Sequence, residues 1–487
     1  MEKTELQTNV DKSPGYEYFQ EKRRDHWDAI AERLQHWQGF GGYYHKRLQE
    51  VYRLHVPDGC KVLEIGCGQG DLLAALNPSL GVGIDFSEKM IERARRRHPH
   101  LRFIWADAHE LALNEQFDYI ILSDLLNDVW DVHAVLKGLQ EVSHARTRII
   151  TNHYSRLWEL PLKAAEALGW AKPNLQQNWL TVEDQKNLLT ISGFEVIRHI
   201  EEIIWPLPFP LVGPLMNKVL VRLWPFRHLA LTNVIIAKPS PSITSEPRNP
   251  KVSVIVPARN EEGNIESIFQ RLPALGSHTE LILIEGHSSD DTFRIIKECM
   301  VKYPDVDAHL FRQTGVGKGD AVRRGFNEAH GDIVMILDAD LTVPPEDLGV
   351  FVDVLTSGKG EFANGVRLVY PMEGEAMRFV NLVGNKFFSV AFSWMLGQPI
   401  KDTLCGTKVL WKKDYESIAK NRAYFGDFDP FGDFDLLLGA AKLNLTIVDI
   451  PVRYRRRMYG TTNIQRWRHG ALLLRMLLFA SRRLKFV

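Results

Sequence analysis

The stretch Lys61-Val-Leu-Glu-Ile-Gly-Cys-Gly-Gln-Gly70 decides the fold of the first half of this chain. The apolar run KVLEI is typical of a buried strand, and DLLAAL, after Gly70, continues at helical spacing. Glycine permits a positive φ and lets a ligand approach the backbone closely. The stretch therefore predicts a strand, a ligand-binding turn and a helix. A GxGxG turn alone also suits nicotinamide and flavin sites, so it does not name the ligand.

Further strand–helix pairs follow this turn, and two of the strands end in an acid. The segment VGID ends at Asp85, fifteen residues after Gly70, and LRFIWAD ends at Asp107. Strand–helix alternation predicts a parallel sheet covered by helices. An acid at the end of the second strand can accept both hydroxyls of a ribose, and one after the third strand can meet an adenine edge.

Residues 61–145 resemble class I methyltransferases that depend on S-adenosylmethionine (SAM). The resemblance rests on four segments in the family's order and spacing: EIGCGQG, GIDFSEKMIERAR, ADAHEL and FDYIILSDLLNDVWD. It implies a Rossmann-like fold in which Asp85 holds the ribose and Asp107 holds the adenine amino group. The other cofactor-site residues that it implies are Glu64, Gly66, Gly68 and Gly70. The competing interpretation is a dinucleotide-binding oxidoreductase or an inactive fold.

Residues after the fourth and fifth strands are candidates for the methyl-acceptor site. Methyl transfer is a displacement at a sulfonium carbon, and alignment alone can contribute up to ~7–11 kcal/mol. The reaction therefore requires no particular base. The candidates, each of which could equally be an ordinary loop residue, are Asp124, Asn127, Asp128, His153 and Tyr154.

The length of 487 residues predicts two domains, because single cores stop growing near ~250–300 residues. Residues 1–15 read as disordered, and aromatic and apolar residues at helical spacing over 16–55 predict one or two amphipathic helices. The Pro- and Ser-rich segment Lys238–Pro250 predicts an exposed linker. We expect a helical extension over 1–55, a methyltransferase over 56–238, a linker over 239–250 and a second α/β domain over 251–487.

The composition indicates the class of protein and its cellular compartment. The fractions of hydrophobic (45%) and charged (25%) residues are those of a soluble globular protein, and the formal net charge of zero gives no nucleic-acid signal. Four scattered cysteines lack metal or disulfide spacing, which fits a reducing cytosol. The polar N-terminus has no apolar run, so we expect no secretory signal.

In the second half, the apolar strand DIVMIL ends in Asp338-Ala-Asp340. Two carboxylates one residue apart repel each other unless a cation lies between them, and Mg²⁺ typically bridges a carboxylate to substrate phosphates. The pair follows three other polar segments: PARNEEGNI, IEGHSSDDT and GKGDAVRRG. In this order, the pieces resemble family 2 glycosyltransferases of the GT-A fold, and most of all the dolichol-phosphate mannose synthase type.

This second resemblance covers residues 251 to about 465. It implies a nucleotide-sugar donor, and it places three residues at the base and ribose end of the pocket: Pro257, Arg259 and Glu261. Glu285 stands where the family usually has an Asp that contacts the base, which leaves the base open. Lys318 lies in a loop suited to a pyrophosphate, and Asp338 and Asp340 would hold Mg²⁺ or Mn²⁺ against the donor phosphates.

Acids further along the chain are candidates for catalysis. The segment IKDTLCGTKVLW matches the family's acceptor-side loop around Asp402 and Gly406, and GDFDPFGDFD follows with Asp427, Asp429, Asp433 and Asp435. Asp433 or Asp435 is the natural catalytic acid, although Asp435 could only complement a helix dipole. A lipid phosphate acceptor is already an anionic nucleophile and would need no base.

The C-terminal region is strongly basic, with ten Lys or Arg and no acid after Asp449. Three residues of PVRYRRRMYGTTNI could clamp phosphate oxygens: Arg455, Arg457 and Asn463. The final segment, Arg466–Val487, places Arg468, Arg475 and Arg482 seven residues apart. It predicts a helix lying on an anionic membrane surface, or else a terminal helix packed on the enzyme.

Two apolar stretches could contact a membrane or pack within the protein. They are VGNKFFSVAFSWMLGQPI and WPLPFPLVGPLMNKVLVRLWPF (Trp205–Phe226). Both are too short or too interrupted to span a bilayer, which takes ~20 apolar residues. Membrane attachment, core packing and a domain interface all remain open for them.

The sequence as a whole predicts a cytoplasmic, membrane-peripheral enzyme with two transferase sites. The C-terminal half transfers a sugar, with inversion, to a polyprenyl phosphate or similar lipid-linked acceptor, and the N-terminal half methylates an acceptor of unknown identity. The alternatives are a soluble glycosyltransferase that acts on a glycan, and a single active transferase whose partner domain is only a scaffold.

Overall fold

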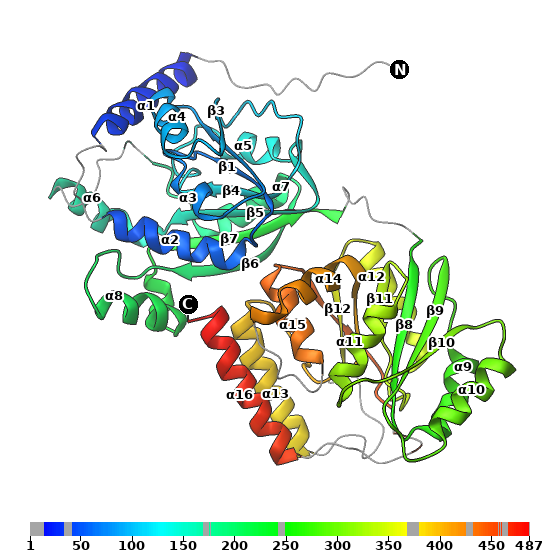
Figure 1. Cartoon of the computed structure of the whole chain (residues 1–487). Coiled ribbons are helices and arrows are strands. Elements are labelled where there is room, and N and C mark those ends of the chain that lie inside the picture. The colour runs from blue at the N-terminus through cyan, green and yellow to red at the C-terminus, as the bar shows by residue number, and fades with distance from the viewer. Residues whose placement is uncertain are drawn as a thin grey trace, which may run out of the picture. The chain divides into compact units, whose positions relative to one another are not determined.

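The computed structural model describes residues 14–33, 41–168, 175, 177–241, 249–367, 379–424, 432–455, 457, 459 and 466–486. The chain divides into two compact units, one from Met1 to Ser245 and the other from Glu246 to Lys485 (Figure 1). Each unit is a sheet covered by helices, so the predicted class of two α/β domains is confirmed.

The first unit is built on a seven-stranded sheet of order β3-β2-β1-β4-β5-β7-β6. Its strands are β1 (Lys61–Ile65), β2 (Leu80–Asp85), β3 (Arg102–Trp105), β4 (Phe117–Ser123), β5 (Ser143–Tyr154), β6 (Phe194–Glu202) and β7 (Thr232–Pro239). The prediction of a parallel sheet is wrong for β7, which runs antiparallel to β5 and β6. No crossover helix joins β6 to β7, so the chain re-enters the sheet in the opposite direction.

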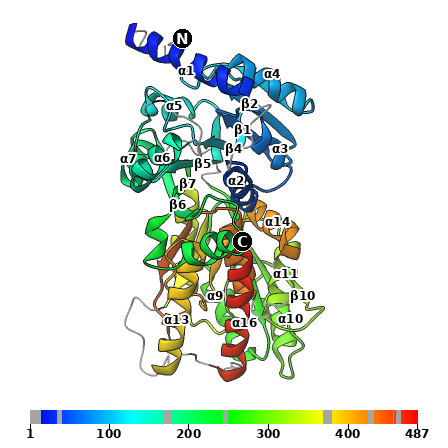
Figure 2. The ribbon, with the colours of Figure 1, turned by 90° about the vertical axis from the view of Figure 1, so that its left-hand side faces the viewer.

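Helices cover both faces of this sheet (Figure 2). They are α1 (Pro14–Arg33), α2 (Gly41–His55), α3 (Asp71–Ala75), α4 (Glu88–Arg97), α5 (Val132–Gly138), α6 (Glu159–Ala167), α7 (Val182–Ile191) and the short α8 (Val212–Pro214). One core cluster joins the sheet to α2, α3 and α4, and another joins its other face to α5 and α7. Both α1 and α2 fall where the sequence predicts amphipathic helices.

The second unit has a seven-stranded sheet of order β10-β9-β8-β11-β13-β12-β14. The strands are β8 (Lys251–Ala258), β9 (His278–Glu285), β10 (Asp307–Arg312), β11 (Ile333–Ile336), β12 (Phe362–Val366), β13 (Lys408–Trp411) and β14 (Ile447–Pro451). Strands β8, β9 and β11 are parallel, so their carboxyl ends meet at one edge. Strand β13 runs antiparallel to β11 and β12.

The helices of the second unit are α9 (Glu262–Arg271), α10 (Thr292–Lys302), α11 (Lys318–Glu328), α12 (Leu348–Thr356), α13 (Phe379–Leu396), α14 (Lys412–Lys420), α15 (Asp433–Lys442) and α16 (Arg466–Leu484). Helices α13 and α16 lie side by side (Figures 1 and 2). Helix α16 buries Leu473, Met476 and Leu477 and exposes Leu474 and Leu478. In the part of the chain that the structure describes, no helix is both long and apolar enough to cross a membrane.

Candidate functional sites

The glycine turn after β1 has the predicted backbone. Gly66, Gly68 and Gly70 all have positive φ, at 74°, 52° and 76°. A Cβ at Gly66 would lie 2.9 Å from Leu125 Cδ1, and one at Gly70 would lie 2.5 Å from the Phe103 ring. A Cβ at Gly68 would meet no atom within 4 Å. Packing therefore explains the outer glycines, whereas the middle one borders open space where a ligand can approach the backbone.

Asp85, at the end of β2, is tied to this turn. One carboxylate oxygen accepts the Gly68 N–H at 2.8 Å, and the other accepts the Ser87 N–H at 2.9 Å. Burial raises the pKa of Asp85 to about 6, although both backbone hydrogen bonds act in the opposite direction. A carboxylate oxygen has more than one acceptor position, so ribose hydroxyls can still bind. The glycine turn and Asp85 thus fit the cofactor that the sequence predicts.

Glu64 lies beneath the turn. Its buried carboxylate accepts the Leu73 N–H at 3.0 Å, and burial raises its pKa to about 8. Because Leu73 belongs to the first turn of α3, Glu64 supports the start of that helix.

Asp107 is contacted by Tyr16, which the sequence analysis did not identify as a site residue. Tyr16 of α1 donates its hydroxyl to Asp107 Oδ2 at 2.8 Å, while the His109 N–H lies 2.9 Å from Oδ1. Burial would raise the pKa of Asp107, but the hydrogen bonds from His109 and Tyr16 outweigh it and hold the pKa below its ordinary value. Asp107 therefore lies two residues after the end of β3, and Tyr16 and His109 already bind its carboxylate.

Helix α1 makes two further contacts with the loops at this edge. Asp128, a candidate acceptor residue, receives hydrogen bonds from Arg23 Nε at 2.9 Å and Trp27 Nε1 at 2.7 Å. Ser87, the N-cap of α4, donates its hydroxyl to Asp28. The edge of the sheet that carries Asp85 and Asp107 is thus covered by α1. The only sequence signal for this cover is the aromatic and charged pattern of residues 16–33.

The acceptor candidates separate onto the two faces of the sheet. Asp124 has a φ of 54° and accepts hydrogen bonds from the Tyr44 hydroxyl at 3.0 Å and from Asn152 Nδ2. Burial raises its pKa to about 7 against the effect of these hydrogen bonds. Tyr154 packs beside Tyr44, with ring centroids 5.9 Å apart. Asp124 and Tyr154 are therefore brought together in one buried polar group.

The other two candidates lie elsewhere. His153 is fully buried, and burial lowers its pKa to about 4. Asn127 is also buried, and its side-chain amide has no hydrogen-bond partner among the described residues. Successive β5 side chains point to opposite faces, so His153 points away from the face that holds Asn152 and Tyr154.

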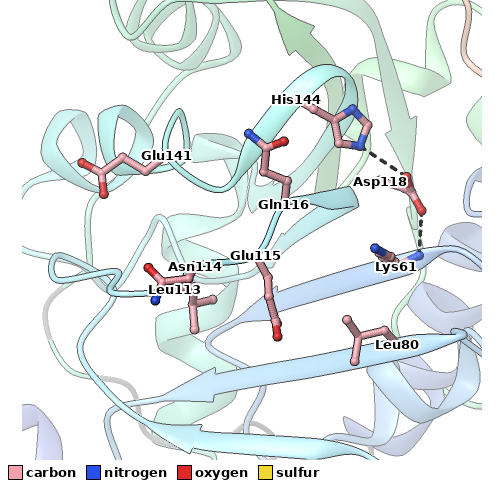
Figure 3. A pocket seen from close by; sticks show the side chains of 9 residues that line it. All are labelled: Lys61, Leu80, Leu113, Asn114, Glu115, Gln116, Asp118, Glu141 and His144. Atoms are coloured by element: carbon pink, nitrogen blue, oxygen red, sulfur yellow. Dashed lines mark hydrogen bonds and ion pairs between the residues drawn. The ribbon is translucent and has the colours of Figure 1, made fainter.

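A polar hollow lies at the opposite edge of the same sheet (Figure 3). There Asp118 accepts the Lys61 N–H at 2.8 Å and contacts His144 Nε2 at 3.3 Å. Lys61 and Leu80 begin β1 and β2, so the hollow lies at the amino ends of the strands. Ligands of open α/β sheets bind at the carboxyl ends, so we do not assign the hollow to the cofactor site.

In the second unit, the residues predicted to bind the base and ribose lie at the carboxyl ends of β8 and β9 or shortly after β8. Pro257 lies in β8 and Arg259 is exposed directly after it. Glu261 is buried, accepts a hydrogen bond from Asn264 Nδ2 at 2.7 Å, and has a pKa raised by burial. Glu285 ends β9, accepts the Ser288 N–H and lies 3.8 Å from Arg312 Nε. These residues share one edge of the sheet, as the sequence predicts.

The residues predicted to bind phosphate and metal meet at the same edge. Lys318 begins α11, and its Nζ lies 2.6 Å from Asp338 Oδ1. Burial would raise the pKa of Asp338, but Lys318 outweighs it and lowers the pKa. Thr342 donates both its N–H and its hydroxyl to Asp340 Oδ1, at 3.1 and 2.8 Å. A Cβ at Gly406 would lie only 2.0 Å from Asp338 Oδ2, so a larger residue there would displace the Asp338 carboxylate.

This donor set fits a hard divalent cation. It offers two carboxylates, Asp338 and Asp340, and oxygen ligands of this kind suit Mg²⁺ and Mn²⁺. The described residues contain no group of three or more His, Cys, Asp or Glu side chains that could form a complete metal cage. Mg²⁺ is ordinarily bound by one or two carboxylates together with substrate phosphates, which agrees with such a partial set.

A basic residue from the C-terminal region completes the cluster. Arg457 Nη2 lies 2.7 Å from Asp340 Oδ2, and Nη1 lies 3.5 Å from Glu261 Oε1. Arg455 is exposed, and its N–H donates to Thr342 O at 2.9 Å. The structure therefore brings Arg457 beside the carboxylates, whereas the charge of Arg455 acts on Glu346 and Asn463 lies outside the described residues.

Asp402 is fully buried and closely held. Arg367 Nε lies 2.7 Å from Oδ2, Arg367 Nη2 lies 2.9 Å from Oδ1, and Asn385 Nδ2 also donates to Oδ1 at 2.9 Å. Burial would raise the pKa of Asp402, but Arg367 outweighs it and holds the pKa well below its ordinary value. An acid bound in this way is suited to positioning Arg367.

The other predicted acids lie on or before α15. Asp435 contacts Arg422 Nε at 2.7 Å. Asp433 is the first residue of α15, and a Cβ at the preceding Gly432 would lie 2.8 Å from Gly319 Cα. The start of α15 is therefore close to the first turn of α11, which carries Lys318. The side chain of Asp433, and Asp427 and Asp429 altogether, lie outside the described residues.

Comparisons with known proteins match each of the two units to a different family. Residues 57–193 match the methyltransferase domain family, and residues 253–418 match glycosyl transferase family 2. The dolichol-phosphate mannosyltransferase of Pyrococcus furiosus is 34% identical over 176 residues, which are 35% of this chain and 49% of that protein. The undecaprenyl-phosphate 4-deoxy-4-formamido-L-arabinose transferase of Proteus mirabilis is 33% identical over 112 residues, 22% of this chain and 34% of that protein.

The match therefore spans about half of the first relative and about a third of the second. Among solved structures, an S-adenosylmethionine dependent methyltransferase from Mesorhizobium loti is 20% identical, with a TM-score of 0.30. That match covers 39% of this chain and 94% of the other.

Proposed function

The chain joins a methyltransferase domain to a family 2 glycosyltransferase domain, and from this premise we propose that it is a bifunctional transferase. The C-terminal domain transfers a sugar from a nucleotide-sugar to a polyprenyl phosphate, and the N-terminal domain transfers a methyl group from SAM. We assign residues 1–55 to a helical extension, 56–238 to the methyltransferase, 239–250 to a linker and 251–487 to the glycosyltransferase. The expectation of an exposed linker is wrong for Lys238 and Pro239, which are buried as the last two residues of β7.

The observation that carries the sugar-transfer proposal is the cluster of Lys318, Asp338, Asp340 and Arg457. Each carboxylate contacts one cation, at 2.6 Å for Lys318 and 2.7 Å for Arg457. Asp338 and Asp340 would hold the cation of a metal-bound diphosphate, and Lys318 and Arg457 would bind its phosphate oxygens. Donor binding thus exchanges the partners of all four side chains, and Arg457 can bind two phosphate oxygens at once.

Mg²⁺ or Mn²⁺, when bound, stabilises the charge that develops on the leaving nucleoside diphosphate. Pro257, Arg259, Glu261 and Glu285 hold the base and ribose end of the donor. We assign Arg455, which is exposed, and Asn463, which lies outside the described residues, to binding phosphate oxygens.

A polyprenyl phosphate acceptor is supported by the names of the relatives, one for dolichol phosphate and the other for undecaprenyl phosphate. An acceptor phosphate oxygen attacks the anomeric carbon as the bond to the nucleoside diphosphate breaks, which inverts that carbon. The phosphate is already anionic, so no side chain has to accept a proton. In this reaction Asp402 positions Arg367, and Asp433 and Asp435 shape the acceptor loop. With a glycan hydroxyl as acceptor, Asp433 or Asp435 would instead serve as the base.

For methyl transfer, Gly68 and Asp85 would hold SAM, and Asp107 would bind its adenine amino group. The acceptor's lone pair forms the new bond to the methyl carbon while the carbon–sulfur bond breaks and S-adenosylhomocysteine leaves. We assign Asp124 as the group that receives the acceptor's proton. Its pKa of about 7 leaves part of it ionised at neutral pH, and Tyr44 and Asn152 hold it in place.

We place the chain at the cytoplasmic face of a membrane as a peripheral protein, because a polyprenyl phosphate is held there. The outward side of α16 supports this, since it combines exposed Leu474 and Leu478 with exposed Arg475 and Arg482. An apolar side bordered by cations is typical of helices that lie on anionic bilayers.

The proposal is tested by incubating the chain with a short polyprenyl phosphate, a panel of UDP- and GDP-sugars, and Mg²⁺ or Mn²⁺. We expect metal-dependent transfer to the lipid that falls at least about 100-fold in Asp340→Asn. The matched control is Asp353→Asn, which changes an exposed acid on α12 and should keep full activity. Metal-dependent donor hydrolysis without lipid transfer would move the acceptor to a glycan. Transfer that persists in Asp340→Asn would overturn the metal-site assignment.

A further inference from the structure

The connection between β6 and β7, residues 203–231, presents an unusual number of large apolar side chains to solvent. Leu211 is 86% exposed, Trp224 75%, Phe209 54% and Leu229 53%. Other exposed members are Val212, Leu215, Val219, Leu223 and Phe226. Figure 1 shows this connection, with α8, beside the edge strand β6. Exposed apolar patches of this kind mark interaction surfaces far more often than isolated exposed residues do.

The connection is anchored to the methyltransferase unit by buried polar contacts. The side-chain oxygen of Asn217 accepts the N–H groups of Ile204 and Trp205 at 2.9 and 2.8 Å, and its Nδ2 donates to Trp205 O at 2.7 Å. The buried Arg222 donates to Glu201 O at 3.1 Å and also contacts Glu202. The apolar side chains thus project from a fixed platform.

The charges of the connection suit an anionic surface. No Asp or Glu occurs from Ile203 to Ser245, whereas Lys218, Arg227 and His228 lie among the apolar residues. Of these, Arg227 is paired with Glu201 of β6 at 3.8 Å. Trp224 and Phe226 are aromatic residues of the kind that lie at the headgroup level of bilayers. Apolar and aromatic side chains mixed with cations, without acids, complement anionic phospholipid.

The geometry excludes a spanning segment. The longest helical run of the connection covers residues 212–222, in which α8 (Val212–Pro214) continues into a π-helical turn and a 3₁₀ turn. A spanning helix needs ~20 apolar residues, and five prolines interrupt this connection: Pro206, Pro208, Pro210, Pro214 and Pro225. A segment of this shape can only lie in the bilayer surface.

The connection also borders the acceptor side of the methyltransferase. Asn217 Nδ2 lies 3.3 Å from the Tyr43 hydroxyl, and a Cβ at Gly213 would lie 2.5 Å from the same oxygen. The next residue, Tyr44, donates to Asp124 at 3.0 Å. An acceptor held in the bilayer surface would therefore lie near the Asp124 side of the sheet.

We propose that residues 203–231 dock the methyltransferase unit on the surface of an anionic phospholipid bilayer, with Leu211 and Trp224 among the inserted side chains. Docking does not depend on sugar transfer or on α16.

The test is co-sedimentation of the full chain with vesicles of 30% phosphatidylglycerol and 70% phosphatidylcholine, without polyprenyl phosphate or donor, using about 0.1 M salt to limit weak surface attraction. The variant carries Leu211→Asp and Trp224→Asp. The matched control carries Ile191→Asp and Val301→Asp, which remove two exposed apolar side chains and add the same charge elsewhere. We expect the vesicle partition coefficient to fall at least about tenfold in the variant and to stay within about twofold in the control.

The same pair of variants is then measured in a background with Leu474→Asp and Leu478→Asp, which removes the contribution of α16. There the docking variant should no longer sediment with vesicles. Thermal unfolding should match across all chains, because the substituted side chains are exposed. Equal vesicle partition coefficients for the docking variant and its control would overturn the proposal. A native chain that does not bind anionic vesicles would also overturn it. A change from dimer to monomer with unchanged partition would show that the surface binds a second copy instead.

Because sugar transfer is not measured, failure here leaves the proposed glycosyltransferase activity untouched. Conversely, a chain that binds vesicles but transfers no sugar would keep the docking surface.

Discussion

Gly406 shows how closely the second site is packed around its charges. A Cβ there would lie 2.0 Å from Asp338 Oδ2 and 2.4 Å from Lys318 Nζ. A Gly406→Ala substitution must therefore displace the carboxylate, the ammonium group or both. We expect sugar transfer to fall by about 100-fold, because displacements near 1 Å can cost that much in rate.

The matched control is Gly349→Ala in α12, where a Cβ would meet nothing within 4 Å. Steady-state sugar transfer in both variants checks the prediction. Full activity in Gly406→Ala would mean that Lys318 and Asp338 are not part of the donor site.

Asp124 gives the first unit a pH dependence whose sign can be worked out. Its pKa is about 7 in the folded chain, against about 3.9 when unfolded, so the folded state binds more protons between these values. The free energy of unfolding therefore falls as pH rises from about 4 to 7, by up to about 4 kcal/mol for this group. Asp124→Asn, which stays neutral, should lose this dependence.

Thermal unfolding of the native chain and of Asp124→Asn at pH 5 and pH 8 measures the effect. The variant should gain stability relative to the native chain at pH 8 compared with pH 5. A stability difference that stays constant with pH would show that Asp124 is ionised in the folded chain throughout this range.

At the level of elements, α1 acts as a cover over the cofactor edge of the first sheet. It reaches Asp107 through Tyr16 and reaches Asp128 through Arg23 and Trp27. Asp128→Asn removes the charge that pairs with Arg23, so we expect α1 to open more often. Hydrogen exchange of residues 14–33 should then be about tenfold faster, because exchange reports the free energy of local opening.

The control for this prediction is Asp58→Asn, an exposed acid before β1. Addition of SAM should slow exchange in α1 of the native chain. Unchanged exchange in Asp128→Asn would mean that packing of α1, including Ile30 against Met90, suffices without the ion pair.

The same elements show what the sequence can predict and why. The glycine turn with Asp85 and the strand end with Asp338 and Asp340 are local patterns, so their places in the sheets follow from spacing. The Tyr16–Asp107 and Arg457–Asp340 contacts join residues 91 and 117 positions apart, and no local pattern names such partners. The antiparallel direction of β7 could not be predicted, because a buried strand has the same sequence pattern in either direction.

Asp402 is an instructive intermediate case. Its segment predicted a residue on the acceptor side, but the chemical availability of a carboxylate depends on what contacts it. Arg367, 35 positions earlier, binds both oxygens, and only the folded chain shows this.

At the level of the whole molecule, the two sites lie in separate compact units, each with its own core. A substitution that damages one site should therefore leave the activity of the other site intact. This independence distinguishes a bifunctional enzyme from one active transferase joined to a scaffold, in which damage to the scaffold's pocket changes no activity.

The most direct measurement is a crossed experiment on Asp85→Asn and Asp340→Asn, each assayed for SAM binding by calorimetry and for metal-dependent sugar transfer. Asp85→Asn should weaken SAM binding at least about tenfold, as loss of hydrogen bonds to a charged group does, and should keep sugar transfer. Asp340→Asn should lose sugar transfer and bind SAM normally. A native chain that binds no SAM or transfers no sugar, or a substitution that leaves its own site unaffected, would contradict the assignment of two working transferase sites.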